Sequence, residues 1–168
     1  MAVSSRVSDP FAAAAALHLA ITPRLEAKDI NQEIKECALQ AAGELLCALH
    51  GQLAPASRDG LLRLLLDRLR NEITRLRALQ TLGRVAAAEP KVDMGAVLGE
   101  YSLEAAALLR QQSQNLRLVS LEVLDVLDVL VRCHREGIEA AVVGKFLKEC
   151  GAVMVDSDLH MSHLALSV

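Results

Sequence analysis

Apolar residues recur along this chain at the spacing of amphipathic helices, and short turn signals interrupt them. A helix that buries one face places its apolar residues at i, i+3, i+4 and i+7. The interruptions contain residues that break helices, such as Pro90 and Gly137, or that cap them, such as Asn71. The pattern predicts eight helices, at residues 10–26 (strained or broken near Pro23), 32–49, 56–69, 72–88, 94–110, 114–134, 138–150 and from 158 onward.

The predicted helices repeat at intervals of 40 to 45 residues. The recurring pattern is Ala38-Leu39-Gln40 with Gly43, then Ala78-Leu79-Gln80 with Gly83, then Ser120-Leu121-Glu122, then Ala165-Leu166. The same offsets connect four residues of types that favour helix N-caps: Asn31, Asn71, Ser113 and Asp158. The recurring Ala or Ser is expected where a neighbouring helix crosses, because a larger side chain would push the two helices apart.

Intervals of this length are typical of HEAT and armadillo repeats, in which each unit is a pair of antiparallel helices. The predicted fold class is therefore all-α, a HEAT-repeat α-solenoid with about three full repeats and a partial one at each end. We expect a single segment, 1–168, divided into partial repeat 1–28, repeats 29–70, 71–112 and 113–155, and partial repeat 156–168. Both ends carry apolar faces, whereas solenoids end in polar capping repeats, so we expect a piece of a longer protein.

Composition narrows the possible functions. Apolar residues make up 52% of the chain but aromatic residues only 2%, and the net charge is −3. Nucleic-acid binding usually needs a basic balance with aromatic stacking residues, so no nucleic-acid partner is expected. The longest apolar run, 11–21, is too short to span a membrane. Four cysteines without a C-x-x-C pair indicate reduced, buried thiols in an intracellular protein of the cytoplasm or nucleus: Cys37, Cys47, Cys133 and Cys150.

The sequence offers weak candidates for chemistry. Cys133 and His134 are adjacent, so on a helix they point about 100° apart and cannot form a nucleophile–base pair. Acidic and histidine residues cluster near the C-terminus, where helix capping explains them better than a zinc site does: Asp156, Asp158, His160 and His163. Neither a glycine-rich phosphate loop nor a Gly-x-Ser-x-Gly motif occurs. We therefore expect no enzyme, cofactor, metal or small-molecule substrate.

Charge is distributed unevenly along the chain. Seven arginines and three acidic residues lie between Arg58 and Arg84, whereas eleven acidic and six basic residues lie between Asp93 and Asp158. Five residues in or next to the predicted helix 56–69 are candidates for a partner-facing surface: Arg58, Arg63, Asp67, Arg70 and Arg75. The alternative is a solvated face with i, i+4 ion pairs such as Asp59–Arg63.

Six short segments spread over nearly the whole chain point to one family. They are Pro23-Arg24-Leu25, residues 29–36, residues 67–76 (DRLRNEITRL), Lys91-Val92-Asp93, Val97-Leu98-Gly99-Glu100 and residues 157–162. The run around Asn71 is the most specific of them. Together they resemble the cullin-associated, neddylation-dissociated (CAND) proteins, a family of cullin exchange factors.

The resemblance implies a long HEAT-repeat protein that wraps around an unneddylated cullin–RING core and promotes exchange of substrate-receptor modules. This chain would match part of the middle of that solenoid, as a non-enzymatic scaffold and binding segment whose partner is the cullin–RING-box core. The family's terminal arms have no counterpart here, so exchange activity is not carried over to this chain alone. A HEAT scaffold of another class, either a nuclear transport receptor or a phosphatase scaffold, is the alternative, because one fold serves many partners.

Overall fold

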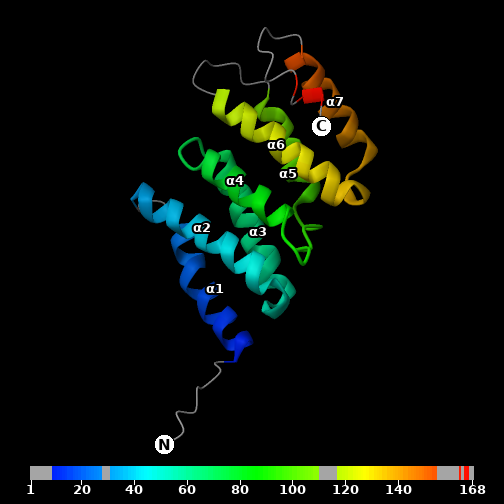
Figure 1. Ribbon diagram of the computed structural model, residues 1–168. Coiled ribbons are helices and arrows are strands. Elements are labelled where there is room, and N and C mark those ends of the chain that lie inside the picture. The colour runs from blue at the N-terminus through cyan, green and yellow to red at the C-terminus, as the bar shows by residue number, and fades with distance from the viewer. Residues whose placement is uncertain (1–8, 28–30, 110–116, 155–162, 164, 167–168) are drawn as a thin grey trace, which may run out of the picture.

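The computed structural model describes residues 9–27, 31–109, 117–154, 163 and 165–166, and these residues form an all-α structure (Figure 1). Two short 3-10 helices, η1 (His50–Gln52) and η3 (Arg135–Gly137), follow the second and sixth α-helices. The α-helices are α1 (Pro10–Glu26), α2 (Gln32–Leu49), α3 (Pro55–Arg70), α4 (Arg75–Ala86), α5 (Leu98–Leu108), α6 (Arg117–His134) and α7 (Ala140–Met154). The eighth predicted helix, from 158 onward, lies largely outside the described residues.

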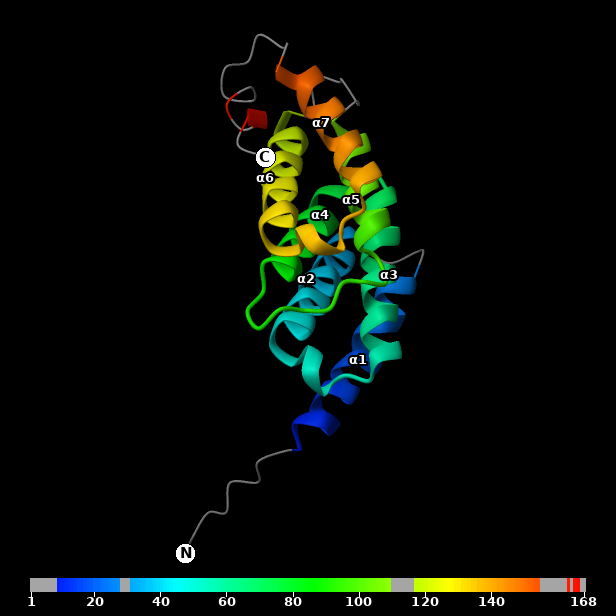
Figure 2. The same cartoon turned by 90° about the vertical axis from the view of Figure 1, so that its right-hand side faces the viewer.

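The helices stack in two layers, as Figure 2 shows. The odd layer consists of α1, α3, α5 and α7, and the even layer consists of α2, α4 and α6. Helices pair across the layers (α1 with α2, α3 with α4, α5 with α6), and α4 packs between α2 and α6 within the even layer. Each unit therefore contacts its sequence neighbours, which is the arrangement of a solenoid. The predicted fold class, a helical HEAT-type segment, is confirmed.

The first helix is continuous, although a break near Pro23 was expected. Pro23 lies in the last turn of α1, where its missing N–H removes a single hydrogen bond. Side chains on both sides of it donate to helix carbonyls: the Thr22 hydroxyl donates to the His18 carbonyl at 2.9 Å, and the Arg24 guanidinium donates to the Ala20 carbonyl. These bonds support the turn, so the helix ends at Glu26.

The predicted N-caps are confirmed for one helix and wrong for another. The Asn31 side chain accepts the N–H of Glu33 at 3.0 Å and caps α2. The Asn71 side chain makes the equivalent bond to Ile73 at 3.0 Å, but α4 begins only at Arg75, after Thr74. Asn71 therefore holds a turn between α3 and α4. The other two predicted caps, Ser113 and Asp158, lie outside the described residues.

A turn also delays the start of α5, which was expected at residue 94. The Asp93 carboxylate accepts the N–H of Gly95 at 3.0 Å, and the helix begins at Leu98. The chain therefore leaves α4, makes a tight polar turn and enters the odd layer four residues later than the apolar pattern indicates.

Small residues allow the even-layer helices to pack closely. Ala38 and Ala78 are buried, as expected for positions where helices cross. The tightest approaches are at the recurring glycines. A β-carbon on Gly43 would lie 2.6 Å from the Thr81 Cγ2 methyl, and one on Gly83 would lie 2.8 Å from a Val126 methyl. Both distances are well below the about 3.5–4.0 Å of normal carbon contacts, so glycine is required for this spacing.

Two side chains illustrate how far the core extends. The single tyrosine, Tyr101, is fully buried on α5, and its hydroxyl donates to the Leu79 carbonyl of α4 at 3.2 Å. Burial, with a smaller contribution from the Glu122 charge, raises the pKa of Tyr101 well above its usual value. The expectation of buried cysteines is wrong for Cys37, which is exposed because it lies on the outward side of α2. All four thiols are free, and Cys150 is buried.

Candidate partner-binding face

Four of the five candidate residues predicted from the sequence lie on α3, and the fifth, Arg75, begins α4. Pro55 occupies the first turn of α3, where its missing N–H costs nothing. One side of α3 is buried through five leucines: Leu61, Leu62, Leu65, Leu66 and Leu69. The opposite side exposes Arg63, Asp67 and Arg70, whereas Arg58 and Arg75 are partly buried. The helical period therefore separated the two faces correctly, but the five candidate residues differ in what they can contact.

Two of the candidate arginines link α3 to later parts of the chain, Arg70 to a helix and Arg58 to the α4–α5 connection. Arg70 donates to Glu100 at 3.0 Å and to Glu104 at 2.9 Å, and so joins α3 to α5. The hydrogen bonds to Glu104 and then Glu100 raise the pKa of the Arg70 guanidinium. Arg58 pairs with Asp59 at 2.9 Å and with Asp93 at 3.1 Å, and its side chain is only 18% exposed. Both arginines therefore hold the solenoid together.

A third candidate is also engaged within the protein. The Nε of Arg75 donates to the Leu69 carbonyl at the end of α3 at 3.4 Å. The expected i, i+4 pair Asp59–Arg63 is not formed, because Asp59 bonds its immediate neighbour Arg58. On the exposed side of α3, Arg63 therefore makes no ion pair with a described residue, and Asp67 pairs with its neighbour Arg68 at 3.1 Å.

Arg63 and Asp67 line a groove between α1 and α3, two odd-layer helices that pack side by side (Figure 2). The groove has a volume of about 520 Å³. Its walls are His18, Thr22 and Glu26 on α1, and Ala56, Ser57, Gly60, Arg63, Leu64 and Asp67 on α3. Each wall follows one helical stripe, so the groove runs along the two helices.

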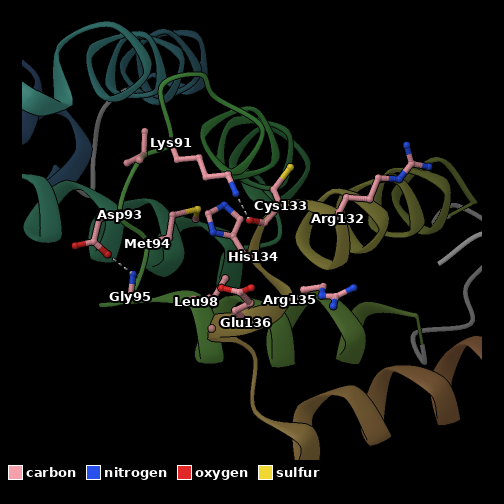
Figure 3. Close-up of a pocket in the computed structure, with 12 residues that line it drawn as sticks. Lys91, Asp93, Met94, Gly95, Leu98, Arg132, Cys133, His134, Arg135 and Glu136 are labelled. Carbon is pink, nitrogen blue, oxygen red and sulfur yellow. Dashed lines mark hydrogen bonds between the residues drawn. The ribbon is translucent and has the colours of Figure 1, made fainter.

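A second cleft, of about 660 Å³, lies where the α4–α5 connection meets the end of α6 (Figure 3). Its polar groups cap helices. The Lys91 amine donates to the Cys133 carbonyl at 3.0 Å, and a ring nitrogen of His134 bonds the Ala86 carbonyl at 2.9 Å. A cation such as the Lys91 amine is favourable at the C-terminal end of a helix. His134 therefore serves packing, and the adjacent Cys133 does not form a nucleophile pair with it.

A ladder of polar contacts crosses the even layer. Arg84 pairs with Glu44 at 2.6 Å and Arg77 with Glu36 at 3.9 Å, while the Gln80 amide donates to Glu122 at 3.2 Å. These pairs were not predicted from the sequence. A signal for them exists, because the partners of Arg84 and Gln80 are 40 and 42 residues away, which is the repeat interval.

Side chains able to bind a metal ion are dispersed in the part of the chain that the structure describes. No group of three or more His, Cys, Asp or Glu side chains gathers there to hold a metal ion. Of the C-terminal cluster, Asp156, Asp158 and His160 lie outside the described residues, and His163 is exposed. No described helix is both long and apolar enough to cross a bilayer.

The stacked helix pairs and the contacts at the repeat interval define the class of protein, a HEAT-type helical-repeat segment. No family model matches the chain. It is 36% identical over 161 residues to cullin-associated NEDD8-dissociated protein 2 of Rattus norvegicus, which covers 96% of this chain and 12% of the relative. It is 32% identical over 152 residues to cullin-associated NEDD8-dissociated protein 1 of Arabidopsis thaliana, covering 90% and 12%. The chain therefore belongs to the cullin-associated NEDD8-dissociated family.

The extent of the match matters for function. The Drosophila melanogaster protein 1 of this family is 27% identical over 145 residues, which again covers most of this chain but 11% of the relative. The chain thus spans about 12% of the length of the relatives it matches. The family resemblance predicted from the sequence is confirmed. Because the chain matches only this part of its relatives, any activity of the whole relatives is a proposal when applied to this chain.

Proposed function

We propose that this chain is a non-enzymatic scaffold and binding segment that contacts an unneddylated cullin–RING core. In that role it takes part in the assembly of cullin–RING ubiquitin ligases and in substrate-receptor exchange, in the cytoplasm or nucleus. The observation that carries the proposal is the similarity to cullin-associated relatives over 96% of the chain.

The mechanism is complementarity of shape and charge over the odd layer. Because Arg58, Arg70 and Arg75 bond other parts of the protein, their main contribution is to fix the spacing of α3 relative to its neighbours. Arg63 and Asp67 present exposed charge beside a groove, so they form the centre of the proposed contact. Charged rims of this kind steer association and make it sensitive to salt.

We also propose the repeat boundaries 29–70, 71–112 and 113–155, with partial repeats 1–28 and 156–168. Their support is the recurrence of the Ala38 pattern at intervals of 40 to 45 residues, which the boundaries follow, whereas the most closely packed helix pairs each straddle a boundary. The stability of such an array is the sum of the stabilities of its repeats and of the interfaces between them. A truncation inside a repeat therefore lowers the stability by more than the deleted residues alone contribute.

The test is calorimetric titration of this chain, shown to be helical by circular dichroism, against an unmodified cullin–RING-box core at two salt concentrations. We expect binding that weakens at the higher salt concentration, because exposed charges are screened within about 8–10 Å near physiological ionic strength. A fully helical chain that produces no binding heat at either salt concentration would contradict the proposal.

A further inference from the structure

The charged residues that line the groove between α1 and α3 differ from Arg58 and Arg70 in whether they pair with residues beyond their own helix. Elsewhere, Arg58 and Arg70 reach acidic residues beyond α3. In the groove, Arg63 makes no ion pair with any described residue. Asp67 is 57% exposed and pairs with its sequence neighbour Arg68 at 3.1 Å. The groove therefore presents charge that the described fold does not use for cohesion between helices.

Its size and shape suit a few side chains of a partner. The volume of about 520 Å³ falls in the roughly 300–1,000 Å³ range of pockets that enclose small ligands. Gly60 opens the wall of α3, since a β-carbon built there would meet no atom within 4 Å. Leu64 and Ala56 provide apolar lining between the polar side chains. The groove can hold a few side chains of a partner as one part of a larger contact surface, because its volume is far too small for a folded domain.

The charges in the groove follow a definite order. Arg63 and Asp67 are four residues apart on α3, which places them about one helical turn, or roughly 6 Å, apart along the helix axis. Glu26, at the C-terminal end of α1, lines the same groove as Asp67 and makes no ion pair within the described residues. The groove thus presents a guanidinium on α3, a carboxylate about one turn further along the same helix, and a second carboxylate on α1.

We propose that this groove docks a protein segment carrying an acidic and a basic side chain about one helical turn apart. The acidic group bonds the Arg63 guanidinium, and the basic group lies against the carboxylates of Glu26 and Asp67. A nucleic-acid backbone fits less well, because its phosphates would be repelled by those carboxylates. The inference rests on the proposed function, in that the docked segment belongs to the cullin–RING core.

Two variants test the groove with matched controls. Gly60→Leu fills the groove from an open position, and Gly51→Leu adds the same side chain at an open, exposed position in η1, outside the odd layer. Arg63→Ala removes the unpaired guanidinium, and Arg77→Ala removes an exposed arginine from the even layer. The affinity of each purified chain for the unmodified cullin–RING-box core is measured by calorimetry, and circular dichroism establishes that each variant is folded.

We expect Gly60→Leu and Arg63→Ala each to weaken binding about tenfold or more, whereas Gly51→Leu and Arg77→Ala stay within about twofold of the wild-type chain. Wild-type binding that neither Gly60→Leu nor Arg63→Ala weakens overturns the groove and leaves the proposed function standing. A helical wild-type chain that does not bind the core at all overturns the proposed function and the groove together. The two failures are thus distinguished by the wild-type titration.

Discussion

The close approach of α2 and α4 makes Gly43→Ala an informative substitution. In most helix interiors this change stabilises, because alanine is favoured over glycine by about 1 kcal/mol. Here the new methyl would lie 2.6 Å from the Cγ2 methyl of Thr81, a β-branched residue that is itself buried on α4. Since Thr81 has restricted χ1 freedom in a helix, the contact can be relieved mainly by moving the helices apart.

The expected size of the effect follows from two opposing terms. Overpacking a tight core costs about 1–3 kcal/mol. A contact more than 0.8 Å inside the lower limit of about 3.5 Å belongs in the upper part of that range. Subtracting the gain in helix propensity of about 1 kcal/mol from a cost of about 2–3 kcal/mol leaves a net loss of about 1–2 kcal/mol in the free energy of unfolding. For a chain of this length that corresponds to a Tm lower by about 2–8 °C.

Thermal and urea unfolding followed by circular dichroism would measure the change, and Thr81→Ser supplies the control because it removes the Cγ2 methyl alone. In the Thr81→Ser background, Gly43→Ala should be neutral or stabilising, which gives a coupling free energy of about 1 kcal/mol or more between the two sites. If Gly43→Ala alone raises the Tm, the account of closely packed even-layer helices is refuted.

Three further predictions concern the core and the ion pairs. Tyr101 should resist ionisation in the folded chain: because its folded pKa is raised, stability is constant below the usual pKa of about 10 and falls as the pH rises above it, which ultraviolet difference titration combined with urea unfolding would show. Arg70→Ala breaks exposed pairs with α5 and should cost less than about 1 kcal/mol, with a smaller cost at 1 M salt. Leu124→Asp places an unpaired charge in the buried face of α6 and should abolish the cooperative melt, whereas Asp125→Asn on the exposed side should leave it unchanged.

The layered fold was predictable because its determinants are local and recur at a fixed interval. Asn31 caps α2 as its residue type indicates, and the repeated Ala38/Ala78 and Gly43/Gly83 positions are buried between helices. The starts of two helices were not predictable. Asn71 and Asp93 each bond the N–H two residues ahead, and the same bond opens a helix at Asn31 but holds a turn at the other two residues.

The candidate site was predictable in part for a related reason. The 3.6-residue period is enough to place Arg63 and Asp67 on the exposed side of α3. The period cannot indicate that Arg70 reaches Glu100 and Glu104, because those partners are 30 and 34 residues away and depend on how α3 lies against α5. The groove itself depends on the separation of α1 and α3, which follows from packing and not from either helix alone.

Hydrogen–deuterium exchange of this chain, free and saturated with the unmodified cullin–RING-box core, tests most directly the claim that the odd layer contacts the partner. Binding reduces local opening of the helices that it covers, and exchange of their amides slows. The account predicts slower exchange in peptides from α1 and α3, with unchanged exchange in α2 and α4. Exchange that is unaltered throughout, or that slows in the even layer and not in α1 and α3, would contradict it.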